Sequence, residues 1–219
     1  MRLPTAMVLI SWIALSPASA QSDPGAALRS AAERGNVAAI ADAIKSGAPV
    51  DAKDGAGQTA LLLAVAGGHT AVAKALIDAG ASINAQARNQ DTPWLLAGAR
   101  GRAEILRLML PKGPDTTLRN RFGGSALIPA CERAHVEAVE VLLTSKIDVD
   151  LVNNLGWTCL LEIVVLGDGG PRHIEVTKRV LAKGANPNIA DKDGVSPLTH
   201  AKRKGQTEIA RLIAAAGGK

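Results

Sequence analysis

The most constraining feature of the sequence is a hydroxyl residue that returns at a fixed interval. Thr59, Thr92, Ser125 and Thr158 are each 33 residues apart, and Ser196 follows 38 residues later. A hydroxyl at such a place can cap a helix by accepting a hydrogen bond from a free backbone N–H in its first turn. A fixed period in the thirties indicates a solenoid, in which each copy buries its apolar surface against its neighbours.

The stretch Gly57–Ala85 shows what one copy contains. After the expected cap at Thr59, an apolar helix is predicted to run as far as Gly68, and Ala71–Asp78 carries a second apolar stripe. Gly80 lies where a helix commonly ends in a left-handed residue. Two helices this short cannot bury their apolar faces on each other alone, so each copy needs another copy on both sides.

The composition agrees with a stack of helices. Of the 219 residues, 47% are hydrophobic but only 2% are aromatic, and there is no Tyr. A core of Ala, Leu, Ile and Val in close helix–helix contact favours an all-α fold over a sandwich or barrel. The net charge is only +5, and the basic residues are scattered, which argues against nucleic-acid binding.

The first 20 residues have the layout of a secretory signal peptide. Arg2 precedes the apolar run Ala6–Leu15, and Ala18-Ser19-Ala20 forms an A-x-A-like cleavage site. A run of ten apolar residues is too short to span a membrane, so we expect no membrane anchor after cleavage. The mature protein would begin near Gln21, with residues 21–26 as a polar linker.

Two cysteines remain in the mature chain, Cys131 and Cys159. An exported protein meets an oxidising compartment, so a disulfide between them is chemically possible. The interpretation favoured by the surrounding small residues is two buried, unbonded side chains. Two cysteines separated by 28 residues do not form a metal-ligand pattern.

Taken in register, the copies follow the pattern D-x-x-G-x-T-P-L-x-x-A-x-x-x-G-H-x-x-V-x-x-L-L-x-x-G-A-x-x-N-A. Asp191–Ile213 and Gly57–Ala85 follow it most closely. This pattern resembles the ankyrin repeat, and the resemblance extends from about Ala27 to Ala214. It implies an all-α ankyrin-repeat solenoid of helix–turn–helix units joined by β-hairpin-like loops. With the export signal, the chain resembles a bacterial exported ankyrin-repeat protein of the periplasm.

The resemblance divides residues 27–219 into one domain of six repeats. Their predicted bounds are 27–52 for the N-terminal cap repeat, then 53–85, 86–118, 119–151, 152–190 and 191–219 for the C-terminal cap repeat. Repeat 152–190 carries a five-residue insertion, Gly167–Pro171, which we interpret as a flexible loop. Gln90 replaces the turn glycine found in the other copies, and Pro129 lies in the first turn of a helix, where proline is tolerated.

No catalytic or metal-binding motif is evident. His69 and His135 occupy the turn position where ankyrin histidines bridge backbone groups, so both are interpreted as structural. No H-E-x-x-H or G-x-S-x-G motif occurs. The acidic residues are spread along helix surfaces, without a pairing that would raise the pKa of one against another. The sequence therefore predicts a protein that is not an enzyme and needs no cofactor or metal.

In the ankyrin family, contacts with partners come from the hairpin tips and the exposed side of the first helices, and a solenoid offers such positions on one concave face. Phe122 and Trp157 map to adjacent tips, whereas Trp94 maps to a buried leucine position. Arg and Trp dominate interface energetics, so arginines near these aromatics mark a candidate site. The alternative is that Phe122 and Trp157 fold back over the edge of the stack. The predicted partner-binding residues are Arg88, Asn89, Asp91, Arg100, Arg121, Phe122, Glu132, Arg133, Asn154, Leu155 and Trp157.

The function expected from these features is a monomeric periplasmic module that docks a protein partner on its concave face without catalysis. One alternative is an inhibitor or immunity protein against an enzyme or toxin that acts in the periplasm. Another is a metal- or small-molecule-dependent enzyme, which would require a convergent cluster of polar side chains.

Overall fold

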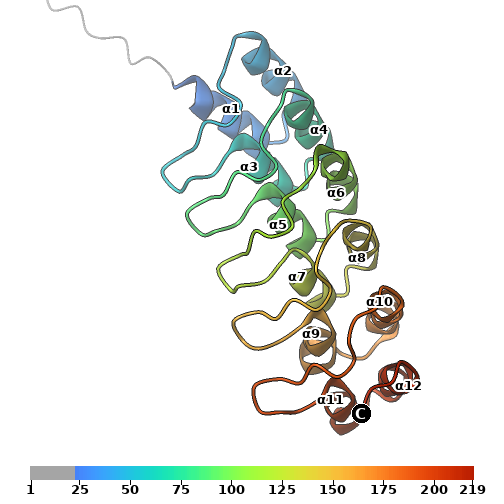
Figure 1. Cartoon of the computed structure of the whole chain (residues 1–219). Coiled ribbons are helices and arrows are strands. Elements are labelled where there is room, and N and C mark those ends of the chain that lie inside the picture. Colours follow the sequence, from blue (N-terminus) through green and yellow to red (C-terminus); the bar gives the residue numbers. More distant parts are fainter. Residues whose placement is uncertain (1–22) are drawn as a thin grey trace, which may run out of the picture.

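The structure is a computed structural model that describes residues 23–219. The predicted signal peptide, residues 1–20, lies outside the described residues. Within the described part the regular structure is entirely helical, and two parallel rows of helices form a curved stack (Figure 1). The predicted all-α solenoid of helix–turn–helix units is therefore confirmed.

Each repeat contributes one helix to each row. The inner row, beside the loops, contains α1 (Pro24–Glu33), α3 (Ala60–Gly67), α5 (Pro93–Ala99), α7 (Leu127–Glu132), α9 (Cys159–Leu166) and α11 (Pro197–Arg203). The outer row contains α2 (Val37–Lys45), α4 (Thr70–Asp78), α6 (Ala103–Met109), α8 (Val136–Leu143), α10 (Pro171–Ala182) and α12 (Thr207–Ala215), and a short 3₁₀ helix, η1 (Leu110–Lys112), follows α6. None of the described helices is long and apolar enough to cross a membrane.

The repeated hydroxyl residues cap inner helices as predicted. Thr59 Oγ1 accepts a hydrogen bond from the Leu62 N–H at 3.3 Å, and Thr92, Thr158 and Ser196 cap α5, α9 and α11 in the same way. The first helix also begins early: the Asp23 side chain caps α1, so this helix starts at Pro24 rather than near residue 27.

Ser125 caps differently because of Pro129. In the other full repeats the residue four positions after the hydroxyl donates its N–H to the carbonyl of the capping residue, as Leu63 does to Thr59 at 3.1 Å. Proline has no N–H and cannot make this bond. As a result α7 begins at Leu127, one position later than its counterparts, and Ser125 Oγ accepts from the Leu127 N–H at 3.3 Å. Pro129 is thus tolerated, as predicted, at the cost of a shorter helix.

The tip loops project from one side of the inner row (Figure 1). Most of them open with an Asp or Asn whose Oδ1 accepts two backbone N–H groups, as Asn120 does from Phe122 and Gly124. At Gln90, where the turn glycine is missing, the side chain does not prevent the turn: the residue takes the left-handed conformation itself, with φ 66°. Only glycine adopts this conformation without a steric cost, so this tip stores strain.

A second series of contacts joins each repeat to the one before it. The residue ten positions after the capping hydroxyl donates a side-chain hydrogen bond to a carbonyl at the end of the preceding inner helix. His69 Nε2 donates to Glu33 O at 3.0 Å, Arg102 to Ala66 O at 3.3 Å and Gln206 Nε2 to Val164 O at 3.3 Å, and His135 bonds the Ala99 backbone. The structural interpretation of His69 and His135 agrees with these contacts.

The insertion Gly167–Pro171, which we interpreted as a flexible loop, is held by hydrogen bonds and ends in a helix. Pro171 already belongs to α10, which has 12 residues. Asp168 Oδ1 accepts from the Gly170 N–H at 2.8 Å and from His173 Nδ1 at 2.7 Å. Because of the five extra residues, His173 takes the bridging place of His69 and donates from Nε2 to Glu132 O at 3.0 Å. The insertion thus preserves the contact between repeats.

The core runs without a break from Leu28 to Ile213 along the interface between the two rows. Trp94 lies in it with 1% of its surface exposed, as its leucine-like position predicted. The interpretation of Cys131 and Cys159 as unbonded side chains was wrong: they form a disulfide between α7 and α9. Stacking places the sixth residue after one capping hydroxyl against the first residue after the next capping hydroxyl, which brings Cys131 to Cys159. Gly98 and Ala126 occupy the same two positions one repeat earlier and also lie in contact.

Removing this disulfide should weaken the stack. The bond closes a loop of 28 residues, which restricts the unfolded chain. We expect the Cys131→Ala/Cys159→Ala variant to lose about 3 kcal/mol of unfolding free energy, measured by urea denaturation. The oxidised protein should release no free thiol when denatured without reductant. Two reactive thiols per chain would contradict the bond.

Candidate functional site

One cleft stands out on the concave side, where tip loops and inner helices of the repeats 86–118 and 119–151 meet. It has a volume of about 610 Å³. Its apolar floor consists of Leu96 and Ala99 on α5 and Pro129 on α7. The charged and polar lining residues are Asp91, Arg100, Arg102, Asn120, Arg121, Glu132, Arg133 and His135, and Phe122 completes the wall.

Phe122 and Arg121 form the tip-loop side of the cleft. The Phe122 ring is 54% exposed, and the guanidinium carbon of Arg121 lies 4.6 Å from the centre of this ring. Arg121 Nη1 also donates to Asp91 Oδ2 at 3.4 Å, which connects neighbouring tips. The cation–π contact and the ion pair orient the arginine while about half of its side chain, 52%, stays in solvent.

The helix side of the cleft carries three more arginines. Arg133 Nη1 donates to Ala99 O at 2.8 Å, and Arg102 is turned toward the preceding repeat through its bond to Ala66 O. Arg100 follows the last residue of α5 and is exposed. Within residues 23–219, the Arg100 side chain makes no hydrogen bond or ion pair, although it lines the cleft. Arg100 is therefore the cation most available to a ligand.

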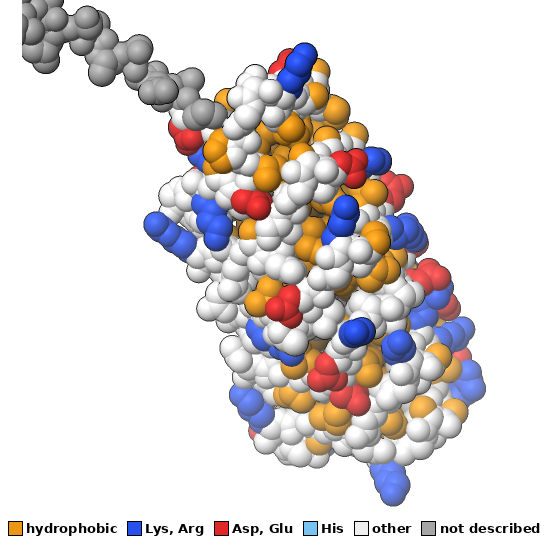
Figure 2. Space-filling view, turned by 45° about the horizontal axis from the view of Figure 1, so that its top comes forward, with side chains coloured by type: hydrophobic (Ala, Val, Ile, Leu, Met, Phe, Trp, Pro, Cys, Tyr) orange, Lys and Arg blue, Asp and Glu red, His pale blue; other side chains and the backbone are white. Residues whose placement is uncertain are grey.

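The cleft has a positive electrostatic character. Its lining contains four arginines against two carboxylates, Asp91 and Glu132. Burial lowers the pKa of His135, and the positive charge of Arg133 lowers it further, so this imidazole is neutral at neutral pH. Two positive charges are left uncompensated. Over the wider surface visible in Figure 2, basic and acidic side chains are mixed rather than gathered into a stripe of one sign.

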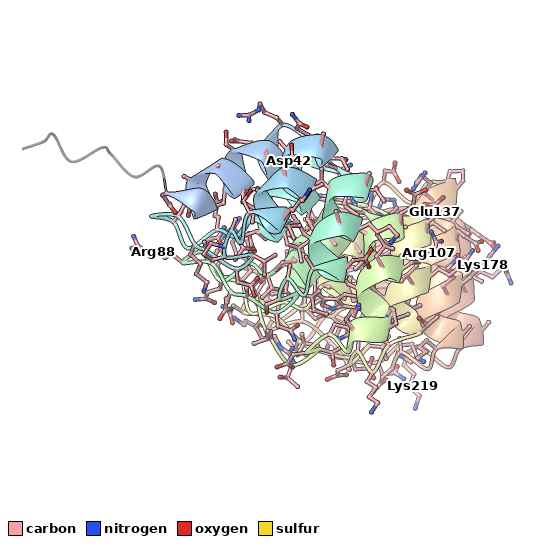
Figure 3. All side chains as sticks on the ribbon, turned by 90° about the horizontal axis from the view of Figure 1, so that it is seen from above. Asp42, Arg88, Arg107, Glu137, Lys178 and Lys219 are labelled. Carbon is pink, nitrogen blue, oxygen red and sulfur yellow. A yellow bond between two sulfur atoms is a disulfide. The ribbon has the colours of Figure 1, made fainter. Side chains whose placement is uncertain are left out.

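The structure brings six of the predicted partner-binding residues together in this cleft. They are Asp91, Arg100, Arg121, Phe122, Glu132 and Arg133. The remaining five do not line it: Arg88, Asn89, Asn154, Leu155 and Trp157. Arg88 lies on the loop side of the molecule, away from the outer-row residues Arg107, Glu137 and Lys178 (Figure 3).

The five residues outside the cleft have different surroundings. Asn89 bonds Asp91 at its own tip, and the Asn154 N–H donates to Phe122 O at 2.9 Å, linking two tips. Leu155 is 53% exposed. Trp157 is only partly exposed and packs against the core, as in the alternative that it covers the edge of the stack. Phe122, by contrast, stays exposed at its tip and does not cover the edge of the stack.

Leu96, Pro129 and Asn120 were missing from the predicted partner-binding residues, although their repeat positions offered a signal. Leu96 and Pro129 are each four residues after a capping hydroxyl, and Asn120 opens a tip loop. From sequence, Pro129 was placed only in the first turn of a helix, and Leu96 and Asn120 were given no role. Whether they also border a cleft depends on how far the tip loops stand from the inner helices, which the repeat pattern does not specify.

One buried carboxyl lies next to this region and contradicts the expectation that no pairing of acidic residues raises the pKa of one of them. Glu162 on α9 is 4% exposed, and its Oε1 accepts from Asn153 Nδ2 at 2.8 Å. Burial raises the pKa of Glu162 to about 7, and the negative charge of Glu132 contributes. In the next repeat, Asp191 and His200 occupy the same two positions and bond at 2.6 Å. The Glu162 carboxyl therefore belongs to a contact that joins the tip loop of its repeat to the inner helix.

Comparison with known proteins settles the family. The family model described as ankyrin repeats (3 copies) matches residues 28–120 and 94–169, which together span more than half of the chain. The chain belongs to the ankyrin-repeat family. Ankyrin repeats generally mediate protein–protein interaction and are typically non-catalytic scaffolds.

Solved structures show the same stack. An ankyrin repeat domain from Acinetobacter baumannii is 45% identical, with a TM-score of 0.84 and coverage of 88% of this chain and 98% of that one. The ankyrin repeat domain of Bcl-3, a member of the IkappaB family, is 28% identical, with a TM-score of 0.77 and coverage of 88% and 86%. The putative ankyrin repeat protein YahD of Escherichia coli is 46% identical over 61 residues, which is 28% of this chain and 30% of that relative.

Glu162 should make the stability of the protein depend on pH. Its pKa rises from an ordinary 4.5 to about 7 on folding, so the folded state holds this proton more tightly than the unfolded state. This contribution to stability is complete below about pH 4.5 and is lost as the pH rises to about 7. We expect Glu162→Gln to gain about 3 kcal/mol relative to wild type between pH 4.5 and pH 8, measured by urea denaturation.

A suitable control is Glu104→Gln, because Glu104 is an exposed glutamate on the outer helix α6. Its stability relative to wild type should change little over the same pH range. A parallel pH response of the two variants would show that Glu162 is not the responsible group.

Proposed function

We propose that this chain is a non-catalytic protein-interaction module of the periplasm, which holds a protein partner on its concave face. The observation that carries the proposal is the cleft, where an exposed aromatic ring and an oriented arginine adjoin an apolar floor. Aromatic and arginine side chains in a central pocket supply most of the binding energy of protein interfaces. The family's general role in protein–protein interaction supports the same conclusion.

The cleft is the centre of the proposed interface rather than its whole extent. A stable protein–protein interface buries about 800 Å² on each partner, which exceeds what a pocket of this volume offers. The tip loops to either side supply further surface, including Arg88 and the exposed Leu155. One anchoring segment of the partner would therefore enter the cleft, while the tips contact the surface around that segment.

Export supports the periplasmic part of the proposal. The sequence has the layout of a cleaved signal peptide, and disulfides persist mainly in oxidising compartments. The bond between Cys131 and Cys159 suits such a compartment.

The interaction can be tested by capturing partners from periplasmic extract and measuring their affinity with purified components. We expect Arg121→Glu/Phe122→Ala to weaken binding about 100-fold or more, because both residues line the central pocket. Arg107→Glu, on the outer helix α6, is a matched charge reversal far from the tips (Figure 3) and should bind normally. All three proteins should melt at similar temperatures, since the ion pair of Arg121 is exposed.

A partner that binds all three proteins equally would show that the interface lies elsewhere. A partner enzyme that loses its activity on binding would define the interaction as inhibition, which is the alternative function derived from the sequence.

The compartment has a separate test. Mass spectrometry of the protein recovered from the periplasmic fraction should give a mass that corresponds to a chain starting at Gln21. Recovery of the full-length chain from the cytoplasmic fraction alone would refute the proposed location without affecting the proposed interface.

A further inference from the structure

We infer that the cleft recognises a carboxylate: its occupant is an extended peptide segment that carries an Asp or Glu side chain next to an apolar one. This inference rests on the proposed function, because it describes the part of the partner that enters the cleft. The residues that carry it are Arg100, Arg121 and Arg133, together with the apolar floor and Phe122.

Two of the four arginines that line the cleft are already paired with carboxylates. Arg121 pairs with Asp91 at 3.4 Å, and Arg133 lies 3.9 Å from Glu132, so each of these pairs is close to neutral. Arg102 uses its Nη2 on Ala66 O. The Arg100 side chain makes no hydrogen bond or ion pair with any residue in 23–219. An arriving anion therefore finds two guanidiniums without an ion pair, Arg100 and Arg102, and of these only the Arg100 side chain, at the end of α5, has all its N–H donors free.

The paired arginines Arg121 and Arg133 still have free N–H donors. A guanidinium offers five N–H donors in a planar fork that matches the two oxygens of a carboxylate. Arg121 and Arg133 each use one nitrogen as hydrogen-bond donor and remain about half exposed, at 52% and 49%. Their internal contacts hold them in place, so less side-chain freedom is lost when they donate to a ligand. Carboxylate binding thus needs little rearrangement of the cleft.

The apolar surface of the cleft favours a peptide over a free anion. Leu96, Ala99 and Pro129 form the floor, and the exposed ring of Phe122 stands at the tip-loop side. A free inorganic anion would leave this apolar surface in contact with water. A peptide segment with an apolar side chain beside its carboxylate covers it, which adds hydrophobic binding energy to the charge-assisted hydrogen bonds.

A nucleic acid fits these observations less well. Its evenly spaced phosphates are bound by rows of basic residues along a surface. Here the cleft contains two carboxylates, and basic and acidic side chains are mixed on the face of the molecule seen in Figure 2. A half-open cleft with an apolar floor suits a few side chains of a peptide better than a charged backbone.

The test uses the mature protein and two capped synthetic hexapeptides, one of alternating Glu and Leu and one of alternating Gln and Leu. We expect the Glu peptide to bind at least about tenfold more tightly at low salt, with the difference reduced to about threefold or less at 0.5 M NaCl. In NMR spectra, the Nε–Hε signals of Arg100, Arg121 and Arg133 should shift on titration with the Glu peptide. The assignments come from single Arg→Lys variants.

A matched pair of variants localises the effect. Arg100→Gln should weaken binding of the Glu peptide about fivefold to tenfold and leave the Gln peptide unaffected, because only one charge-assisted contact is removed. Arg107→Gln on the outer row should change neither affinity. Since Arg100 has no internal partner among the described residues, its removal is not expected to disturb folding, which a thermal melt verifies.

Three results would overturn the inference: equal affinity for both peptides, no saturable binding of the Glu peptide at millimolar concentration, or tighter binding of an oligouridine that shifts the same arginine signals. The proposed function fails in a different way, when a captured partner binds the Arg121→Glu/Phe122→Ala variant normally. If the partner needs the cleft but is insensitive to Arg100→Gln and to salt, the interaction module stands and the carboxylate inference falls.

Discussion

The whole structure depends on the stacking of each repeat against its neighbours. Most of its helices have fewer than ten residues and are too short to be stable alone in water. They persist because a continuous core joins all six repeats, and because one side chain per repeat, such as His69 or Gln206, bonds the end of the preceding inner helix. The stack therefore supplies the stability that no single repeat has.

This dependence on neighbours explains why the irregular features are tolerated. Gln90 holds a left-handed conformation, Pro129 shortens α7, and the insertion before His173 lengthens α10. The insertion keeps the contact with the preceding repeat, because His173 donates to Glu132 O. These departures fall between residues 86 and 190, and so do the disulfide, the buried Glu162 and the cleft. The regular repeats at the ends position this central region.

Much of the fold could be predicted because the signals lie within one repeat. A capping hydroxyl acts on an N–H two or three residues away, so Thr59 and Thr92 could be placed from sequence, and so could the buried Trp94. Contacts between repeats were harder to predict. The Cys131–Cys159 bond and the bridging role of His173 depend on which positions of adjacent repeats meet. The role of His173 was harder still to predict, because the insertion moves this residue out of the regular spacing.

The sequence alone determined the period, the helical class and the family resemblance, and it selected the tips and inner helices as the region of interest. It could do so because spacing and helix caps are local and repeat at a fixed interval. Only the tertiary structure decided that Phe122 lines a cleft while Trp157 packs against the core, that the Arg100 side chain makes no hydrogen bond or ion pair in the described chain, and that Glu162 is buried. These outcomes depend on side-chain direction and on the distance between the tips and the helices of neighbouring repeats, which the pattern of a single repeat does not contain.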